Sequence, residues 1–279
     1  MLLPHATRVR SILEQSSVDP IQICTNICSG MKQSGHVWNE TLHLQMMTWG
    51  FQRLECEYCI YFQHTGNDII IVAIHVNDFF MVSSSRNTLA RFRMQLQSVW
   101  QISDTGDTHF CVGIALSRDR ARRTVSLSQT ALIDCIISQF GLSDAHHVSI
   151  PMDPGLCLSC LTSNATSKEQ HRLTRMPYRS LVGSLMYLAL GTRPDIAYAV
   201  QQLCRYLDCY RAIHWEATKR VVRYLKGTRT LALTLGGEHT ARLLGHTDTD
   251  FATCTDTCRS VSGYCFSLGL SVVTWSAHQ

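Results

Sequence analysis

The sequence lacks any uninterrupted apolar run long enough to cross a membrane, and it is poor in charge. Its most apolar stretch, IIIVAIHVNDFFMV, is interrupted by His75, Asn77 and Asp78, so we expect no membrane segment. The start, MLLPHATRVRSIL, has no basic region followed by a sustained apolar one, so we expect no signal peptide. Charged residues make up 16% and hydrophobic residues 45%, a balance that excludes a disordered chain and predicts a packed core.

Cysteine content and net charge also exclude special classes of protein. The 13 cysteines among 279 residues fall short of the roughly 8–10% typical of a disulfide scaffold, and their number is odd. We interpret them as mostly reduced thiols of an intracellular protein, cytoplasmic or nuclear. Two Cys-x-x-Cys pairs, Cys56–Cys59 and Cys157–Cys160, have a spacing that can bind zinc, but the first borders a strand, where an offset of three separates the side chains. The net charge of +4 does not by itself indicate a nucleic-acid binder.

The first 150 residues alternate hairpin and helix patterns, which predicts an α+β fold. Residues 1–28 show no clear periodicity and are left unassigned. Asn77 and Asp78 separate two apolar runs, and we expect them to form a tight hairpin tip because both residue types tolerate positive φ. The expected strands are 58–63, 68–76, 79–82, 109–117 and 124–128, and the expected helices are 34–49, 89–99 with Ser85 near its cap, and 130–140 closed by Gly141.

In the second half of the sequence the spacing of apolar residues changes first to a helical pattern and then to a strand pattern. Segment 151–177 is rich in Ser and Thr and predicts a linker, after which come three helices and then a second sheet. That sheet reaches Gln279 without a helix to cover it, so we expect the chain to be cut short. The expected helices are 178–190, 194–207 and 214–226, and the expected strands are 231–235, 242–247, 260–268 and 271–275.

An ordered series of these segments resembles one known family, the polymerase region of copia-type LTR retrotransposons, in which reverse transcriptase is followed by RNase H. The series is too long to arise by chance. The resemblance implies a partial reverse-transcriptase palm with thumb-like and connection helices, followed by an incomplete RNase H-like β-sheet. The segments that carry it are CSGMKQSGHVW, IIIVAIHVNDFFMV, FCVGIAL, VSLSQ, FGL, YRSLVGSLMYLALGTRPDIAYAV, HWEATKRVVRYLKGT, LLGHTDTDFA, RSVSGYCFSLG and VVTWSAHQ.

The resemblance assigns a catalytic role to the acidic hairpin tip. Nucleotidyl transfer uses two metal ions, and Mg²⁺ prefers hard oxygen ligands such as carboxylates. By resemblance Asp78 is a metal ligand, and Asn77 stands where the family has another Asp. The family's first catalytic Asp, in an Asp-x-x-x-Ala-Phe strand, has no counterpart before Lys32. Because two of the three expected carboxylates are absent, we expect Mg²⁺ to be an ancestral cofactor and the chain alone to be catalytically inactive.

Two further elements are assigned by the same resemblance. Asp248 matches the first metal-binding Asp of RNase H, and the family's other ligands would lie beyond Gln279, so this catalytic set is incomplete. Lys32 and Gln33 match a nucleotide-binding element, in which a lysine compensates the charge of a triphosphate.

A row of basic residues predicts a nucleic-acid contact. Lys219, Arg223 and Lys226 follow each other at helical spacings of four and three, on the side away from the apolar positions of the same segment. Such a row can follow a phosphate backbone, although a solvated helix face explains the pattern equally well.

These observations favour a fragment of a retrotransposon RNA-directed DNA polymerase that would act on an RNA template or RNA–DNA hybrid, with other Pol segments or another protein chain as partners. The alternatives are a domesticated module that binds an RNA–DNA hybrid or a protein without catalysis, and a pseudogene product without a selected role. The expected domains are 1–28 unassigned, 29–150 palm and thumb, 151–177 linker, 178–230 connection helices and 231–279 the N-terminal part of an RNase H-like domain.

Overall fold

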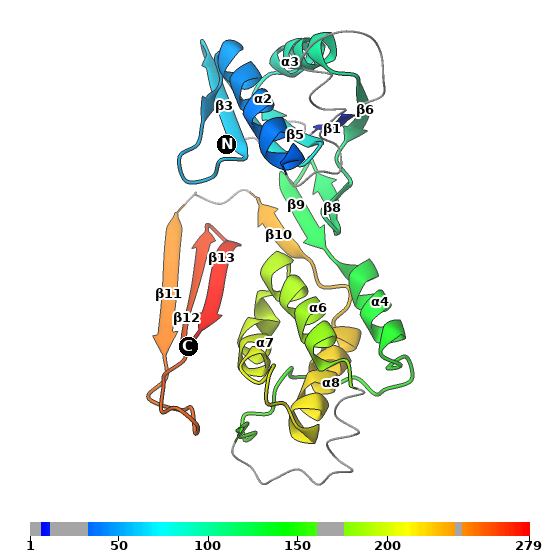
Figure 1. Ribbon diagram of the computed structural model, residues 1–279, viewed down its shortest axis with the longest axis vertical. Helices are drawn as coiled ribbons and strands as arrows, with labels where there is room; N and C mark the ends of the chain where they lie inside the picture. The colour runs from blue at the N-terminus through cyan, green and yellow to red at the C-terminus, as the bar shows by residue number, and fades with distance from the viewer. Residues whose placement is uncertain (1–6, 12–32, 161–175, 238–241) are drawn as a thin grey trace. The chain divides into compact units, whose positions relative to one another are not determined.

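The computed structural model describes residues 7–11, 33–160, 176–237 and 242–279 (Figure 1). These residues form two compact units, Met1–His109 and Phe110–Gln279. Both units mix helices and antiparallel strands, which confirms the α+β prediction. No helix in the described part of the chain is both long and apolar enough to cross a membrane.

In the first unit, α2 and α3 pack against a six-stranded antiparallel sheet. The strand order is β2-β3-β4-β5-β1-β6, and the alternating burial of Ile70, Val72 and Ile74 shows that one face of β4 meets the core. Leu89, Phe92 and Leu96 repeat at helical spacing on α3 and are buried in the same core. The elements are β1 (Thr7–Ser11), α2 (Ser34–Thr48), β2 (Gln52–Arg53), β3 (Ile60–Thr65), β4 (Asp68–His75), β5 (Asp78–Ser83), α3 (Arg86–Val99) and β6 (Ile102–Asp107).

The second unit has a helical core and two sheets. One sheet has the order β10-β9-β8-β7, and the other is a meander of β11, β12 and β13. The elements before the meander are β7 (Phe110–Cys111), β8 (Ile114–Asp119), β9 (Thr124–Ser128), α4 (Thr130–Gln139), α6 (Tyr178–Gly191), a 3₁₀ turn η1 (Pro194–Ile196), α7 (Ala197–Cys204), α8 (Ala212–Gly227) and β10 (Leu233–Gly236). The meander strands are β11 (Leu243–Thr249), β12 (Ser262–Leu268) and β13 (Ser271–His278).

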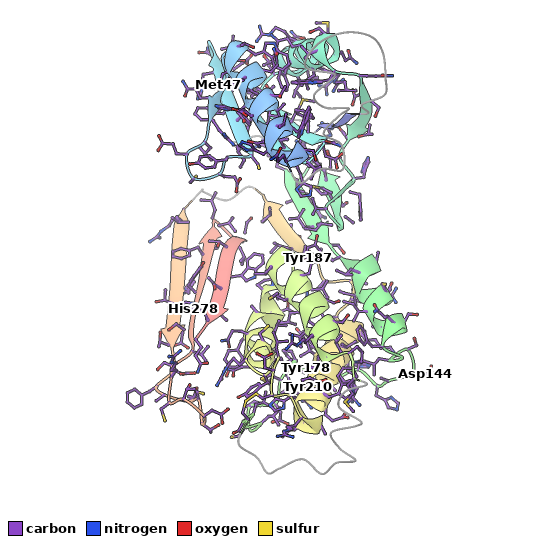
Figure 2. The ribbon with its side chains drawn as sticks, in the orientation of Figure 1. Met47, Asp144, Tyr178, Tyr187, Tyr210 and His278 are labelled. Carbon is purple, nitrogen blue, oxygen red and sulfur yellow. A yellow bond between two sulfur atoms is a disulfide. The ribbon has the colours of Figure 1, made fainter. Side chains whose placement is uncertain are left out.

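The helical core is built from the apolar faces of α4, α6, α7 and α8. Leu185 of α6 and Val221 of α8 have no exposed surface, and Ile133 of α4 is 1% exposed. Tyr178 and Tyr210 stack at 4.6 Å between ring centroids, and Figure 2 shows them side by side at the end of this core. Tyr178 also donates a hydrogen bond to the Leu203 carbonyl at 2.8 Å, which ties α6 to α7.

Three expectations about elements were wrong. The apolar run 109–117 is two short strands, because Val112 and Gly113 both adopt positive φ and form a tight turn between them. Pro194 begins a 3₁₀ turn, and the α-helix after it ends at Cys204, three residues before the predicted end. The strand predicted at 231–235 does not belong to the C-terminal sheet, because β10 pairs with β9 from Leu233↔Leu127 to Gly236↔Thr124.

Candidate functional site

The acidic hairpin tip joins β4 and β5 of the first unit, one residue away from its predicted position. Asp78 is the first residue of β5 and pairs with His75, so the turn consists of Val76 and Asn77. Val76 has a φ of 56°. A β-branched residue rarely adopts this conformation, so the tip carries local backbone strain. Asn77 is exposed and Asp78 is half-buried at the base of this turn.

Helix α2 fixes the backbone of this turn. The indole Nε1 of Trp38 donates to the Val76 carbonyl at 2.8 Å, across 38 residues of sequence. Trp38 is itself packed edge-on against Trp100 at 5.7 Å. Gln33 occupies the N-cap of the same helix, and its carbonyl accepts the first helical N–H bonds. The structure therefore connects the helix that begins at Gln33 with the Asp78 hairpin, whereas Lys32 lies outside the described residues.

Strand β1 occupies the sheet position beside the Asp78 strand. It pairs antiparallel with β5, with Arg10 opposite Asp78, and on its other edge with β6. Its sequence, TRVRS, contains two arginines and no acidic residue. The neighbouring strand therefore contributes no carboxylate to the region around Asp78.

The donor set at this tip does not fit a pair of divalent ions. Asp78 offers one carboxylate and Asn77 only a neutral amide. Across the described ranges, no group of three or more His, Cys, Asp or Glu side chains is arranged to hold a metal ion. Two ions held about 3.5–4 Å apart need several hard oxygen ligands from the protein.

Asp248 lies in the second unit, on the exposed strand β11 opposite Gly263. Its Oδ1 accepts the backbone N–H of Thr249 at 2.9 Å. It lines a cavity of about 820 Å³ together with Asp195 and Asp250, but these carboxylates are not arranged as a metal site. The metal-binding roles of Asp78 and Asp248 therefore stay predictions.

The predicted basic row lies on α8, away from the buried Val221, Val222 and Leu225 as expected, but its charges already have partners. Lys219 forms an ion pair with Glu216 at 2.7 Å. Arg223 Nε donates to the His146 carbonyl at 2.6 Å, and Lys226 Nζ donates to the Ala145 carbonyl at 2.9 Å and to Ser143. Arg223 and Lys226 thus hold the 143–146 segment against the helix.

Two buried polar groups in the second unit escaped the sequence analysis. Arg193 is 2% exposed and paired with Asp195, and His214 has no exposed surface. Nothing in the hydrophobic periodicity marks them, because polar residues on a core face interrupt the pattern and look like ordinary surface positions. The sequence Thr-Arg-Pro-Asp at residues 192–195 contains a proline, which marks a break between helices. This break is the one local signal that could have indicated a special role for Arg193.

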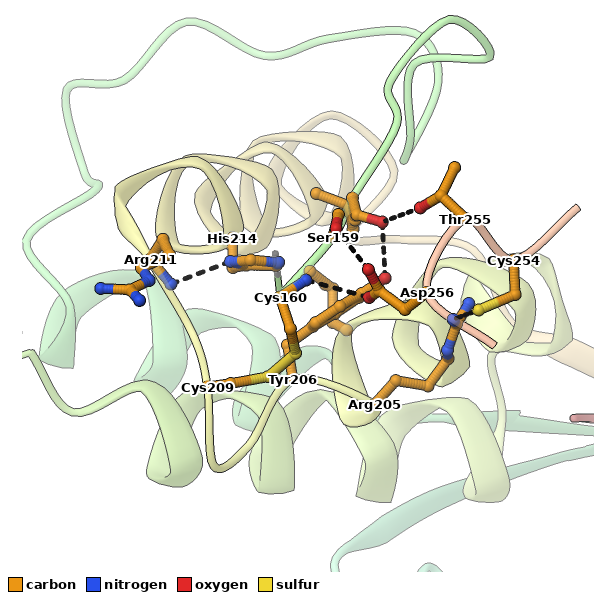
Figure 3. Close-up of a disulfide and its surroundings, with 12 residues drawn as sticks. Ser159, Cys160, Arg205, Tyr206, Cys209, Arg211, His214, Cys254, Thr255 and Asp256 are labelled. Atoms are coloured by element: carbon orange, nitrogen blue, oxygen red, sulfur yellow. Dashed lines mark hydrogen bonds between the residues drawn. A yellow bond between two sulfur atoms is a disulfide. The ribbon is translucent and has the colours of Figure 1, made fainter. Parts of the chain in front are cut away.

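A cysteine-rich corner of the same unit was also missed (Figure 3). Cys160 and Cys209, 49 residues apart, form a disulfide, so the expectation of reduced thiols does not hold for these two cysteines. Cys157 is a free thiol. Next to this bond, Asp256 accepts hydrogen bonds from the Ser159 hydroxyl and from the backbone N–H of Cys160, the latter at 2.9 Å. The loop between β11 and β12 is thereby attached to the 156–160 segment.

Comparison with known proteins gives a consistent set of relatives. Residues 18–154 match the family model described as reverse transcriptase (RNA-dependent DNA polymerase). The chain is 32% identical to the retrovirus-related Pol polyprotein from transposon TNT 1-94 of Nicotiana tabacum, over 89% of this chain but only 19% of the polyprotein. It is 31% identical to a transposon Ty5-1 protein of Saccharomyces cerevisiae, over 89% of this chain and 78% of that protein.

A third relative is the Pol polyprotein from transposon RE2 of Arabidopsis thaliana, 30% identical over 89% of this chain and 16% of the polyprotein. No solved structure matches the chain. Neither alternative function, a domesticated binding module or a pseudogene product, is favoured by these relatives.

Proposed function

Because the chain belongs to the reverse transcriptase family of copia-type retrotransposon Pol polyproteins, we propose that it is a polymerase segment that contacts nucleic acid but does not catalyse nucleotide addition by itself. Reverse transcriptases use divalent metal ions. The observation that carries the proposal is the donor set at the β4–β5 hairpin, where Asp78 stands beside Asn77 and beside a strand without acidic residues. Loss of one well-placed electrostatic group typically costs about 10²–10³ in rate, and loss of two ligands removes the metal site.

Primer extension on an RNA template with Mg²⁺ tests this proposal. We expect no incorporation above background for the chain as it stands, and no change when Asp78 is replaced by Ala. Asn77→Asp is the informative second variant, because it restores one carboxylate and should still leave the site short of a ligand. Magnesium-dependent incorporation that disappears in Asp78→Ala would show that the missing ligands are supplied in another way and would refute the proposal.

We further propose a division of the chain into polymerase and RNase H-like parts. The first unit, with its six-stranded sheet and two helices, supports a palm assignment within residues 29–150, followed by a linker at 151–177 and connection helices at 178–230. The meander β11–β13 with Asp248 on its first strand supports an RNase H-like segment within residues 231–279. Because β10 pairs with β9, we place the start of that segment after β10.

The nucleic-acid contact of this proposal lies on α8, at Lys219, Arg223 and Lys226, with an RNA template or RNA–DNA hybrid as the ligand. We expect replacement of all three by Ala to weaken binding to the hybrid and to reduce the salt dependence, at roughly 0.7–0.9 in log–log slope for each lost phosphate contact. Filter binding at salt concentrations between about 50 and 200 mM measures this effect, because phosphate contacts weaken steeply over that range.

Lys219→Ala separates binding from structure, because Lys219 pairs with its helical neighbour Glu216, whereas Arg223 and Lys226 also support the 143–146 segment. Exposed Arg179, on α6, is the matched control and should leave the slope unchanged when replaced by Ala. An unchanged salt slope in the triple variant would remove this helix from the proposed contact.

A further inference from the structure

The loop between β11 and β12 is held in one conformation by its own carboxylates. Asp250 Oδ1 accepts the Val261 N–H at 2.9 Å, and the Asp250 N–H donates back to the Val261 carbonyl at 3.1 Å, which closes the base of the loop. Asp256, further along, is bound to Ser159 and Cys160 of another segment. These contacts fix the position of Cys254 between the two carboxylates.

Three donors from two parts of the fold converge on the Cys254 sulfur. The backbone N–H and the hydroxyl of Thr257 lie 3.3 and 3.0 Å from Sγ. Arg205 Nη2 donates to the same atom, and Figure 3 shows Arg205 pointing toward Cys254. Arg205 is held in place by Gln202, which accepts from its Nη1 at 2.7 Å, and by the Tyr206 ring. A neutral thiol is a weak hydrogen-bond acceptor, so a guanidinium and two further donors match a thiolate better.

The charge balance around Cys254 agrees with this geometry. Burial raises the pKa of the thiol, but hydrogen bonds from the Thr257 and Gln279 side chains and from backbone N–H groups outweigh it and lower the pKa to about 6. The charged groups nearby are Arg205, Asp250 and Asp256, and the charge of Arg205 lowers the pKa of both carboxylates. One cation is therefore shared among three acidic groups.

Cys254 is 3% exposed, yet it lines the cavity of about 820 Å³ described above, so small molecules have a route to the sulfur. Arg205 and Gln202 line the same cavity beside it. So do Asp195, Asp248 and Asp250, whose negative charges disfavour anionic reagents. The cavity therefore suits a small uncharged electrophile rather than a charged one.

We propose that Cys254 is a redox-modification site whose thiolate, stabilised by Arg205 and Thr257, reacts with small uncharged peroxides entering through this cavity. In the reaction a sulfur lone pair attacks one peroxide oxygen, an S–O bond forms and the O–O bond breaks. The sulfur is oxidised by two electrons to a sulfenic acid. The departing hydroxide takes a proton from solvent and leaves as water, while Arg205 Nη2 and the Thr257 hydroxyl donate hydrogen bonds to the attacking sulfur.

Per-residue mass spectrometry of the full chain tests the thiolate, with iodoacetamide as an uncharged probe across pH 5 to 9. Exposed Cys258, four residues further along the same loop, is the matched internal control. At pH 6.5 a thiol with a pKa of about 6, as for Cys254, is mostly ionised, whereas a model-compound thiol with a pKa of about 8.5 is about 1% ionised. After correction for the lower nucleophilicity of the weaker base, the expected rate advantage of Cys254 over such a reference thiol is about fivefold. Cys254 should reach half of its maximal labelling rate near pH 6.

Two variants test the donors separately. Arg205→Gln removes the cation, and Thr257→Val removes the hydroxyl donor with little change in shape at an exposed loop position. Each should move the labelling midpoint of Cys254 up by at least about one pH unit, which corresponds to a tenfold change in ionisation. If Arg205→Gln does not fold, the Thr257→Val result decides.

The oxidation itself is tested with a limiting amount of hydrogen peroxide and dimedone, which traps sulfenic acid, at pH 6.5. We expect dimedone on Cys254, less on Cys258, and a loss of the Cys254 adduct in both variants. A Cys254 midpoint near that of Cys258, no response to either variant, or dimedone equally on both cysteines would each overturn the proposal.

Discussion

Replacement of Arg193 by Met is expected to destabilise the second unit by about 3–5 kcal/mol, because it removes one partner of a buried ion pair. Arg193 Nε and Nη2 bind the two oxygens of Asp195 at 2.9 and 2.7 Å. The same guanidinium donates to the Thr228 carbonyl at 3.2 Å and to its hydroxyl at 2.7 Å. The variant would therefore leave the Asp195 carboxylate without its guanidinium partner, although the Tyr224 hydroxyl still donates to it at 2.8 Å, and would remove the Arg193 donors from Thr228 at the end of α8.

The position of this network explains why its loss is costly. Arg193 lies between α6 and η1, and Thr228 is the C-cap of α8, so one side chain joins three segments of the helical core. Burial raises the pKa of Asp195, but the hydrogen bonds and charge of Arg193, with the Tyr224 hydroxyl, outweigh it and lower the pKa. Arg193 therefore stabilises the ionised form of this carboxylate.

Hydrogen exchange of peptides from α6, α7 and α8 measures this effect locally and separately from the first unit. Arg179→Met is the matched control, because its pair with Asp208 is exposed, with 69% and 89% of the side chains accessible, and should cost at most about 1 kcal/mol. Arg193→Met combined with Asp195→Asn should recover part of the loss, since it removes the orphaned charge. Equal effects of Arg193→Met and Arg179→Met would show that the network does not stabilise the core.

The fold was largely predictable where apolar residues follow a clear period. The spacing of Leu89, Phe92 and Leu96 predicted α3, and the predicted strand 124–128 coincides with β9. The predicted ends of strands were wrong where the backbone adopts a conformation that the residue type disfavours. Val76 and Val112 both have positive φ, and a β-branched residue in an apolar run gives no sign of a turn.

The site was predictable only as far as local pattern and resemblance reach. The Asp78 hairpin could be found because its residues are consecutive, but the Trp38–Val76 contact joins segments that are far apart in sequence. The basic row on α8 was placed on the correct face, yet its carbonyl partners at 143–146 lie about eighty residues away and have no polar side-chain signature. Long-range pairing of polar groups depends on the packed structure, which spacing along one segment does not encode.

The second large effect that we expect is a loss of stability in mild acid caused by His214. Its side chain has no exposed surface, its Nδ1 accepts the Arg211 N–H at 2.8 Å, and its ring packs on Tyr206 at 4.2 Å. The pKa of His214 is lowered to about 4. Burial is the largest cause, the charge of Arg211 also lowers the pKa, and Asp256 raises it by a smaller amount than burial lowers it. Because Nδ1 is an acceptor, the neutral ring carries its proton on Nε2, and a second proton would break the bond to Arg211.

The pH window follows from the two pKa values. Unfolded His214 binds a proton below about pH 6.5 while the folded form stays neutral down to about 4, so the stability contribution is complete above 6.5 and is lost as pH falls to 4. The difference of about 2.5 units corresponds to roughly 3 kcal/mol. His214→Asn keeps an acceptor for the Arg211 N–H but does not titrate, so its stability should change less over this window.

Hydrogen exchange of α8 peptides at pH 7.5, 5.5 and 4.5, corrected for intrinsic rates, gives the comparison. Carboxylates that do not interact with His214 titrate alike in both proteins, so the difference between wild type and His214→Asn reports the histidine together with its coupling to Asp256. We expect wild type to lose roughly 2–3 kcal/mol more than the variant between pH 7.5 and pH 4.5. Parallel pH profiles would mean that His214 binds its proton as readily in the folded protein as in the unfolded chain, with Asp256 as the nearby carboxylate that stabilises its charge.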